Sequence, residues 1–200
     1  MRVTDPAEPD AELLDRLARG DALALAPVFE HHRARLRRMI EVRLDPRLAG
    51  RLDPDDVLQE VYLAAAQRMG TWSPERGSVL LWLRMIAQQV LVDLFRHHVG
   101  AARRAAGREA APAASGAWSS MFVASMTSPS QVAARADMVQ KVEAALEQMD
   151  PIDREVLVLR HFEELGNKEA AEVLGIQENA ASNRYVRALT RLRGLLGEVS

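Results

Sequence analysis

Hydrophobic residues along this chain recur every three or four positions, the spacing that places them on one face of an α-helix. No window alternates hydrophobic and polar residues with the period of two that is typical of strands. The pattern predicts helices over about residues 11–19, 22–44, 54–69, 78–98, 132–149, 151–163, 167–174 and 179–196. We therefore expect an all-α protein.

The helix predicted over 54–69 has a clear start. Asp53 can cap its free N–H groups, Pro54 suits the first helical position, and the acidic residues that follow lie at the positive end of the helix dipole. The apolar stripe of this helix is expected to consist of Val57, Leu58, Val61, Leu63 and Ala64. Gln59, Glu60 and Arg68 then point toward the exterior.

The helix predicted over 78–98 is apolar around most of its circumference, which is typical of a helix at the centre of a bundle. Its polar exceptions are Arg84, Gln88, Gln89, Asp93 and Arg96.

Between these helices and the last ones the composition changes to Ala, Ser, Gly and Pro without an apolar period, which indicates a flexible linker. We predict two small helical domains, at 11–98 and 137–197, joined by a linker at 99–136. Four apolar residues in the linker leave open whether it also packs on a domain or a partner: Trp118, Met121, Phe122 and Val123.

Charge and composition limit the classes of function. The net charge is -2, so any contact with nucleic acid must be local. The chain has no cysteine, which excludes disulfides and thiolate metal sites. It shows neither an apolar signal core nor an apolar run near the roughly 20 residues that span a bilayer. We expect a cytoplasmic protein without membrane insertion.

The residues from Asn167 onward have the spacing of a helix-turn-helix. Ala171 is the fifth residue, where the helices cross, Gly175 is the ninth, at the turn, and Ala181 is the fifteenth, where the second helix is anchored. The second helix is expected to bury Ala181, Tyr185, Ala188, Leu192 and Leu195.

The opposite face of this last helix has no acidic residue from Ala180 to Gly197. Small and amide side chains at its start can reach base edges in the major groove, and the arginines that follow can contact phosphates or guanine. The residues of this face are Ser182, Asn183, Arg184, Arg187 and Arg191. A terminal helix hairpin with a solvated basic face is the alternative.

The two blocks together resemble the bacterial RNA polymerase sigma factors of the extracytoplasmic-function type, within the sigma-70 family. "DPDDVLQEVYLAA" is similar to the family's region 2.2, and "WLRMIAQQVLVDLFR" is similar to its regions 2.3–2.4. The segment from "LEQMDPIDREVLVLRHFEELGNKEAAEVLG" to "RLRGLL" resembles region 4. Both resemblances occur in the family's order and spacing.

The resemblance implies partners for each block. Region 2.2 binds the clamp helices of the polymerase β′ subunit, which makes Asp56, Gln59 and Glu60 candidates for contact with core polymerase. A well-capped surface helix would explain the acidic residues equally. Region 4 docks on the β flap and reads the −35 element as duplex. The candidates there are Lys168, Ser182, Asn183, Arg184 and Arg187.

Region 2 also recognises the −10 element as the strands open. Trapping unstacked bases requires stacking and hydrogen bonds, and the loop "GTWSPERGS" with the helix after it could supply them. The resemblance makes Trp72, Gln88, Gln89 and Arg96 the candidates. Trp72 could instead be a hydrophobic plug between helices, and Trp82 is expected in the core.

Some positions depart from the family's pattern. Gln88 and Gln89 stand where Arg-Asn is common, Ala170 replaces a larger aliphatic residue, and Ala180-Ala181 replaces a Thr-Val-like pair. The promoter sequence can therefore not be borrowed from relatives. An anti-sigma factor is a possible further partner, and neither it nor the activating signal is identified by the residues.

Two other classes of function share some of these features. A stand-alone helix-turn-helix regulator with a helical N-terminal module would bind duplex DNA without polymerase. An enzyme is disfavoured, because capping explains the acidic cluster, adjacent histidines point to different helix faces, and no Glu-x-x-His pair occurs. We expect no catalytic residue, no cofactor and no metal.

Overall fold

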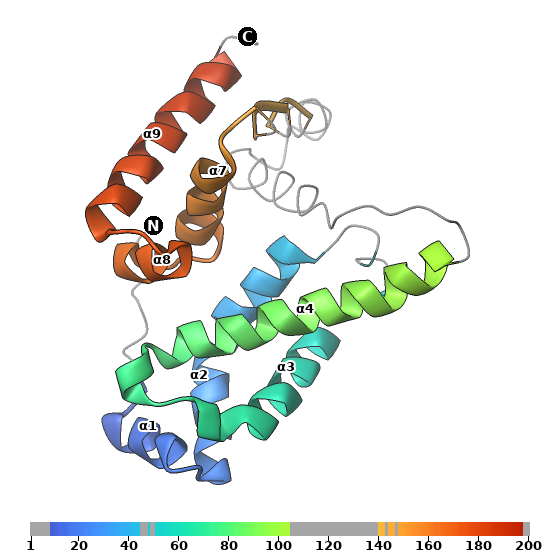
Figure 1. Ribbon diagram of the computed structural model, residues 1–200, viewed down its shortest axis with the longest axis vertical. Coiled ribbons are helices and arrows are strands. Elements are labelled where there is room, and N and C mark those ends of the chain that lie inside the picture. The colour runs from blue at the N-terminus through green and yellow to red at the C-terminus, as the bar shows by residue number, and fades with distance from the viewer. Residues whose placement is uncertain are drawn as a thin grey trace, which may run out of the picture. The chain divides into compact units, whose positions relative to one another are not determined.

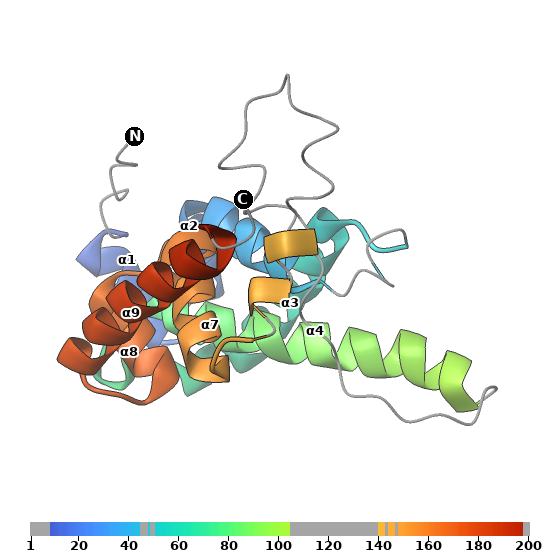
Figure 2. The same ribbon diagram turned by 90° about the horizontal axis from the view of Figure 1, so that it is seen from above.

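The computed structural model describes residues 9–44, 48, 51–104, 140–142, 144–146 and 148–197. The chain divides into two compact units, residues 1–40 with 51–108, and 41–50 with 109–200. The described part of the chain contains helices and no strand, so the predicted all-α class is confirmed (Figures 1 and 2).

The first unit is built from four α-helices and two short 3-10 turns among its described residues. These are α1 (Ala11–Ala18), α2 (Ala22–Arg43), α3 (Pro54–Arg68), η1 (Met69–Thr71), η2 (Pro74–Arg76) and α4 (Val79–Arg104), with the end of α2 lying beyond the first unit's boundary. Helices α3 and α4 pack side by side (Figures 1 and 2). Helix α4 continues past the predicted end at 98, because the alanines and arginines of 101–104 favour helix.

The start of α3 follows the predicted pattern. The Asp53 side chain accepts a hydrogen bond from the Asp55 N–H at 2.8 Å, and Pro54 is the first helical residue. Arg33 of α2 pairs with Asp55 at 2.7 Å, so the acidic first turn of α3 is tied to α2. The cap therefore sets where α3 begins, and the ion pair links its first turn to α2.

One residue of the α3 stripe was predicted wrongly. Val57, Leu58 and Val61 are buried as expected, whereas Leu63 is 54% exposed. The buried stripe continues through Ala65 instead. Leu63 lies three and four positions after Glu60 and Gln59, and this spacing puts it on their exposed face rather than on the buried one.

The second unit has its core between α7 and α9. Helix α7 (Pro151–Leu157) begins at the cap Asp150 and runs into the π-helical turn η3 (Val158–Phe162). Helices α8 (Asn167–Leu174) and α9 (Glu178–Gly197) follow, and α9 packs on both α7 and α8 (Figure 1). The buried apolar residues of this unit include Val142, Leu146, Met149, Val156, Leu157, Phe162, Ala188 and Leu192.

The helix-turn-helix geometry is confirmed. Gly175 has φ 64 and ψ 33, the left-handed conformation that a glycine adopts without steric cost. Ala171 is 2% exposed where the helices cross, and Ala181 is fully buried. Ala188 and Leu192 are also buried, as predicted, and Tyr185 is half-buried.

Some sequence predictions fall on other parts of the chain. The predicted helix 132–149 lies mostly outside the described residues. In the part of it that is described, residues 140–142 and 144–146 are helical. Trp118, Met121, Phe122 and Val123 also lie outside the described residues, as does the side chain of Leu195.

Glu164, in the turn between η3 and α8, has a positive φ of 55. For a residue with a Cβ the left-handed region costs roughly 1–2 kcal/mol, and glycine avoids this cost at the expense of a larger unfolded-state entropy. We expect Glu164→Gly to be more stable than Glu164→Ala by about 1 kcal/mol in the free energy of unfolding, measured by urea denaturation. Both variants lose the same carboxylate, so equal stabilities would show that the turn relaxes at no cost.

His32 is 5% exposed on α2, and neither ring nitrogen has a hydrogen-bond partner among the described residues. Burial, with the nearby charges of His31 and Arg35, lowers the pKa of His32 to about 4. Since the unfolded chain takes up this proton near pH 6.5 and the folded chain does not, stability falls as pH drops from about 6.5 toward 4.

We expect this single group to remove up to about 3 kcal/mol from the free energy of unfolding between pH 7 and pH 4. His32→Leu should abolish most of the loss, measured by urea unfolding across that pH range. His31→Leu is the matched control, because His31 is only half-buried, and it should keep most of the pH dependence. A His32→Leu curve parallel to the parent curve would contradict a neutral buried imidazole.

Candidate nucleic-acid and polymerase interfaces

The exposed face of α9 carries the small and amide side chains predicted to read duplex DNA. Ser182 and Asn183 are exposed and have no side-chain partner among the described residues. The start of α9 is held by α8, since the Asn167 side-chain amide donates to the Glu178 carbonyl at 2.9 Å. Lys168 is exposed in the first turn of α8. Both helices therefore present polar side chains at fixed positions.

Arg184 and Arg187 are not free side chains. Arg184 Nη1 lies 2.7 Å from Asp153 Oδ1 on α7, and Arg187 Nη2 lies 3.2 Å from the same oxygen. Arg187 Nε also donates to Asp153 Oδ2 at 3.4 Å. Arg191 is bound as well, because its Nη2 donates to the Gln148 carbonyl at 3.0 Å. The basic face predicted from the sequence is thus partly engaged inside the second unit.

The side chain of Asp153, which holds Arg184 and Arg187, is 5% exposed. Burial raises the pKa of Asp153, but the hydrogen bonds from Arg187 and Arg184 outweigh it and hold the pKa below its usual value. Asp153 is therefore ionised at neutral pH. Sequence reasoning missed this residue, since nothing in the helical period of α7 shows which side chain it will meet.

Val186 is a second residue of α9 that sequence reasoning missed. It is 60% exposed, four positions after Ser182 and three after Asn183. An apolar side chain on a groove-reading face can contact the methyl group of thymine. The sequence already offered a signal for this role, because the spacing of three and four residues from Asn183 and Ser182 places Val186 on their face of the helix.

The exposed face of α3 brings together all three residues predicted to bind core polymerase. Asp56, Gln59 and Glu60 are exposed and have no side-chain partner among the described residues. Leu63 extends the same face by one turn. This row of acidic, amide and apolar side chains is available to a partner, and we call it the α3 face.

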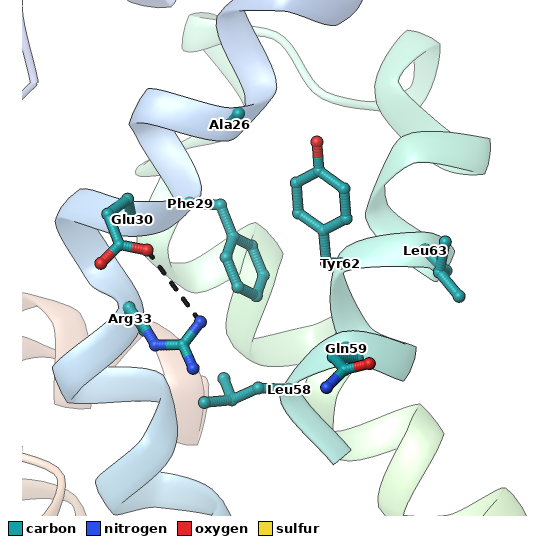
Figure 3. Close-up of a pocket in the computed structure, with 8 residues that line it drawn as sticks. All are labelled: Ala26, Phe29, Glu30, Arg33, Leu58, Gln59, Tyr62 and Leu63. Carbon is teal, nitrogen blue, oxygen red and sulfur yellow. Dashed lines mark ion pairs between the residues drawn. The ribbon is translucent and has the colours of Figure 1, made fainter. Parts of the chain in front are cut away.

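A pocket of about 360 Å³ opens beside the α3 face, between α2 and α3 (Figure 3). The Phe29 and Tyr62 rings meet edge to face there, with centroids 5.2 Å apart. Glu30 and Arg33 lie on its α2 side. The pocket is lined by Ala26, Phe29, Glu30, Arg33, Leu58, Gln59, Tyr62 and Leu63. Gln59 and Leu63 therefore belong both to the α3 face and to an apolar recess.

The four residues predicted to bind the −10 element differ in burial: three are exposed on α4, and Trp72 is buried. Gln88, Gln89 and Arg96 are exposed along α4, together with Met85 at 64% exposure. The Gln89 amide donates to both carboxylate oxygens of Asp93 at 3.0 and 3.1 Å, which orients that amide. These residues form one continuous exposed face of α4.

Trp72, in contrast, is 4% exposed in the loop between η1 and η2. Its Nε1 donates to the Gly77 carbonyl at 3.2 Å, and its ring lies 6.4 Å from the ring of Trp82. Trp82 is buried, as predicted. Trp72 has the position of a hydrophobic plug in this conformation, and stacking on a base would require the loop to release the ring.

The described residues contain no group of His, Cys, Asp and Glu side chains that could hold a metal ion. Within the described helices, none is both long enough and apolar enough to span a membrane.

Two family models match the chain. Sigma-70 region 2 matches residues 28–100, and sigma-70 region 4 matches residues 140–192. The ECF RNA polymerase sigma factor SigD of Mycobacterium tuberculosis is 32% identical over 187 residues, which cover 92% of this chain and 82% of SigD. SigX of Bacillus subtilis is 29% identical over 70% of this chain and 68% of SigX.

Among solved structures, CnrH in complex with the cytosolic domain of CnrY is similar to this chain. The TM-score is 0.57 at 25% identity, and the match covers 96% of this chain and 99% of CnrH.

The ion pairs of Asp153 change what an arginine deletion would measure. Replacing both Arg184 and Arg187 with Ala leaves a buried carboxylate without a partner, so we expect the free energy of unfolding to fall by about 3–5 kcal/mol. Adding Asp153→Asn to the double variant should recover most of this loss, as measured by urea unfolding followed by circular dichroism. No recovery would mean that the arginines stabilise the unit by packing rather than through Asp153.

Proposed function

This chain belongs to the extracytoplasmic-function branch of the sigma-70 family of RNA polymerase sigma factors. We propose that different exposed helix faces bind core polymerase, the −35 element and the −10 element. The chain is a transcription initiation factor that binds core RNA polymerase and promoter DNA. Both units match sigma-70 family models, and a stand-alone regulator would need only the helix-turn-helix. The match in both units therefore favours a sigma factor over a stand-alone regulator.

We propose that the α3 face binds core polymerase through Asp56, Gln59 and Glu60. The unpaired carboxylates and the amide of this face suit the cationic and polar side chains of a partner helix, and the clamp helices of the β′ subunit are the partner that the family implies. Leu63 and the neighbouring pocket add an apolar component, which commonly supplies the central anchor of a protein interface. The acidic residues would set orientation and the apolar contact most of the affinity.

The α9 face is proposed to read the −35 element as duplex, docked at the β flap. Ser182 and Asn183 can reach base edges, Lys168 can reach a phosphate, and Arg184 and Arg187 supply charge-assisted donors. Val186 adds an apolar contact on the same face.

The exposed face of α4 is proposed to contact the −10 element through Gln88, Gln89 and Arg96. Amide side chains can hydrogen-bond to the edges of unstacked bases, and Arg96 can approach the phosphate backbone. The proposed role of Trp72 as a stacking platform depends on its ring leaving the position that it holds against Trp82.

Further features follow from the family. We propose residues 11–98 and 137–197 as the polymerase-binding and −35-binding domains, with 99–136 as the linker. We also propose that the chain has no enzymatic activity, acts in the cytoplasm where polymerase works, and binds an anti-sigma factor. The structure of CnrH with the cytosolic domain of CnrY supports the last point, since it shows a similar fold bound to a second protein.

The first experiment is co-elution of the full-length chain with core polymerase from the same organism by size-exclusion chromatography, followed by run-off transcription of genomic promoter fragments. A stoichiometric complex that initiates at defined start sites is the expected result. If the chain fails to co-elute and binds a specific duplex tightly by itself, it is a stand-alone helix-turn-helix regulator instead.

Leu63 offers a sharp test of the α3 face. We expect Leu63→Asp to weaken binding to core polymerase at least about tenfold, because it places a charge where an apolar side chain of the partner is proposed to pack. Met85→Asp is the matched control, being 64% exposed on α4, and it should leave core binding unchanged. Binding can be measured by competition with a labelled parent chain. Equal losses in the two variants would place the polymerase contact elsewhere.

A further inference from the structure

Two arginines of the proposed DNA-reading helix share one buried carboxylate. Arg184 and Arg187 are three positions apart on α9, and both donate to Oδ1 of Asp153, at 2.7 and 3.2 Å. Arg187 reaches Asp153 through both Nε and Nη2, at 3.4 and 3.2 Å, a forked contact that restrains the plane of its guanidinium. Asp153 therefore restricts the orientation of both side chains.

The two arginines nevertheless keep donors for another ligand. Their side chains are 30% and 60% exposed, although the carboxylate between them is 5% exposed. A guanidinium has five N–H donors, and the contacts with Asp153 use two of those on Arg187 and one on Arg184. Arg184, Arg187 and Asp153 by themselves carry a single net positive charge, and the exposed Asp150 lies farther off, 3.9 Å from Arg184.

We propose that Asp153 is a positioning residue for promoter reading, which sets the orientation of Arg184 and Arg187 and cancels one of their two charges. This rests on the proposed function of α9 as the helix that reads duplex DNA. The carboxylate is too buried to touch DNA itself, so it acts through the arginines.

Each effect has a separate consequence for DNA binding. Arginines that are already oriented lose less conformational freedom when they meet a base or phosphate, which favours the correct site. Cancelling one positive charge removes about one phosphate contact from non-specific DNA binding. The number of phosphate contacts sets how steeply the binding constant falls with salt concentration. Asp153 thereby increases the ratio of specific to non-specific affinity.

A purely structural ion pair would give a different result. If Asp153 only fastened α9 to α7, its removal would lower stability without changing the salt dependence of DNA binding. The salt slope therefore separates a carboxylate that cancels arginine charge from one that only packs α9 against α7.

The test uses the full-length chain and a short fluorescein-labelled duplex of random sequence, with anisotropy measured over a series of KCl concentrations. We expect Asp153→Asn to bind about fivefold to tenfold more tightly near 0.1 M KCl, with a salt slope steeper by about 1. Asp153→Glu, which keeps the charge, should stay near the parent slope. An unchanged slope in Asp153→Asn would overturn the proposal.

Asp150→Asn is the matched control for a lost negative charge. Asp150 lies 3.9 Å from Arg184, is exposed, and caps α7, a role that asparagine can also fill. General electrostatics would make the two Asn variants alike, whereas the direct pairing of Asp153 with both arginines predicts a clearly larger change of slope for Asp153→Asn than for Asp150→Asn. Equal changes would therefore refute the assignment.

A second measurement does not depend on how well the variant folds. In the parent chain, the Nε–H of Arg187 should give a slowly exchanging nuclear magnetic resonance signal because it donates to Asp153. We expect this signal to persist when duplex is added. Its loss on DNA binding would show that the arginine releases the carboxylate, which contradicts positioning.

The failure of this inference can be told from failure of the proposed function. If Ser182→Ala with Asn183→Ala leaves promoter-dependent transcription by the reconstituted polymerase unchanged, α9 is not the reading helix and the proposed function of this face fails. If that double variant loses transcription while Asp153→Asn keeps the parent salt slope, only the role of Asp153 is wrong.

Discussion

Each helix must bury one face in the unit to which it belongs, and this constraint decides which side chains are left to bind anything else. In the first unit, burial of Val57, Leu58 and Val61 turns Gln59, Glu60 and Leu63 outward. In the second unit, burial of Ala181, Ala188 and Leu192 leaves Ser182, Asn183 and Val186 exposed. Apart from the buried Trp72, the candidate contacts with polymerase and DNA lie on the faces that the two cores leave outside.

Carboxylates control the polar side chains on these faces. Asp153 holds two arginines of α9, Asp93 orients Gln89 on α4, and Asp55 ties α3 to Arg33 of α2. A protein that binds a polyanion and places acidic groups beside its cations loses some electrostatic affinity. It gains fixed donor positions, which suits a factor that must distinguish promoters from the rest of the genome.

The α3 face differs in kind from the faces proposed to bind DNA. Its acidic residues would repel phosphates, and its apolar residues border a recess lined by Phe29 and Tyr62. A protein partner fits this chemistry better than a nucleic acid does. The separation of acidic and basic faces explains how a chain with a net charge of -2 can still bind DNA.

Features that depend on residues close in the chain could be predicted from the sequence. The cap at Asp53, the left-handed Gly175 and the buried Ala181 follow from spacing, because capping, turns and helical periodicity act over a few residues. The arginines on the outer face of α9 were also predicted, but not their carboxylate partner.

Only the tertiary structure showed that Arg184 and Arg187 meet Asp153, from which they are 31 and 34 residues away in the chain. The same holds for Trp72, whose burial depends on Trp82 and the Gly77 carbonyl, and for the pocket between α2 and α3. Helical periodicity predicts which way a side chain points but not which side chain of another helix it meets. That choice depends on how the helices pack, and packing is a property of the whole unit.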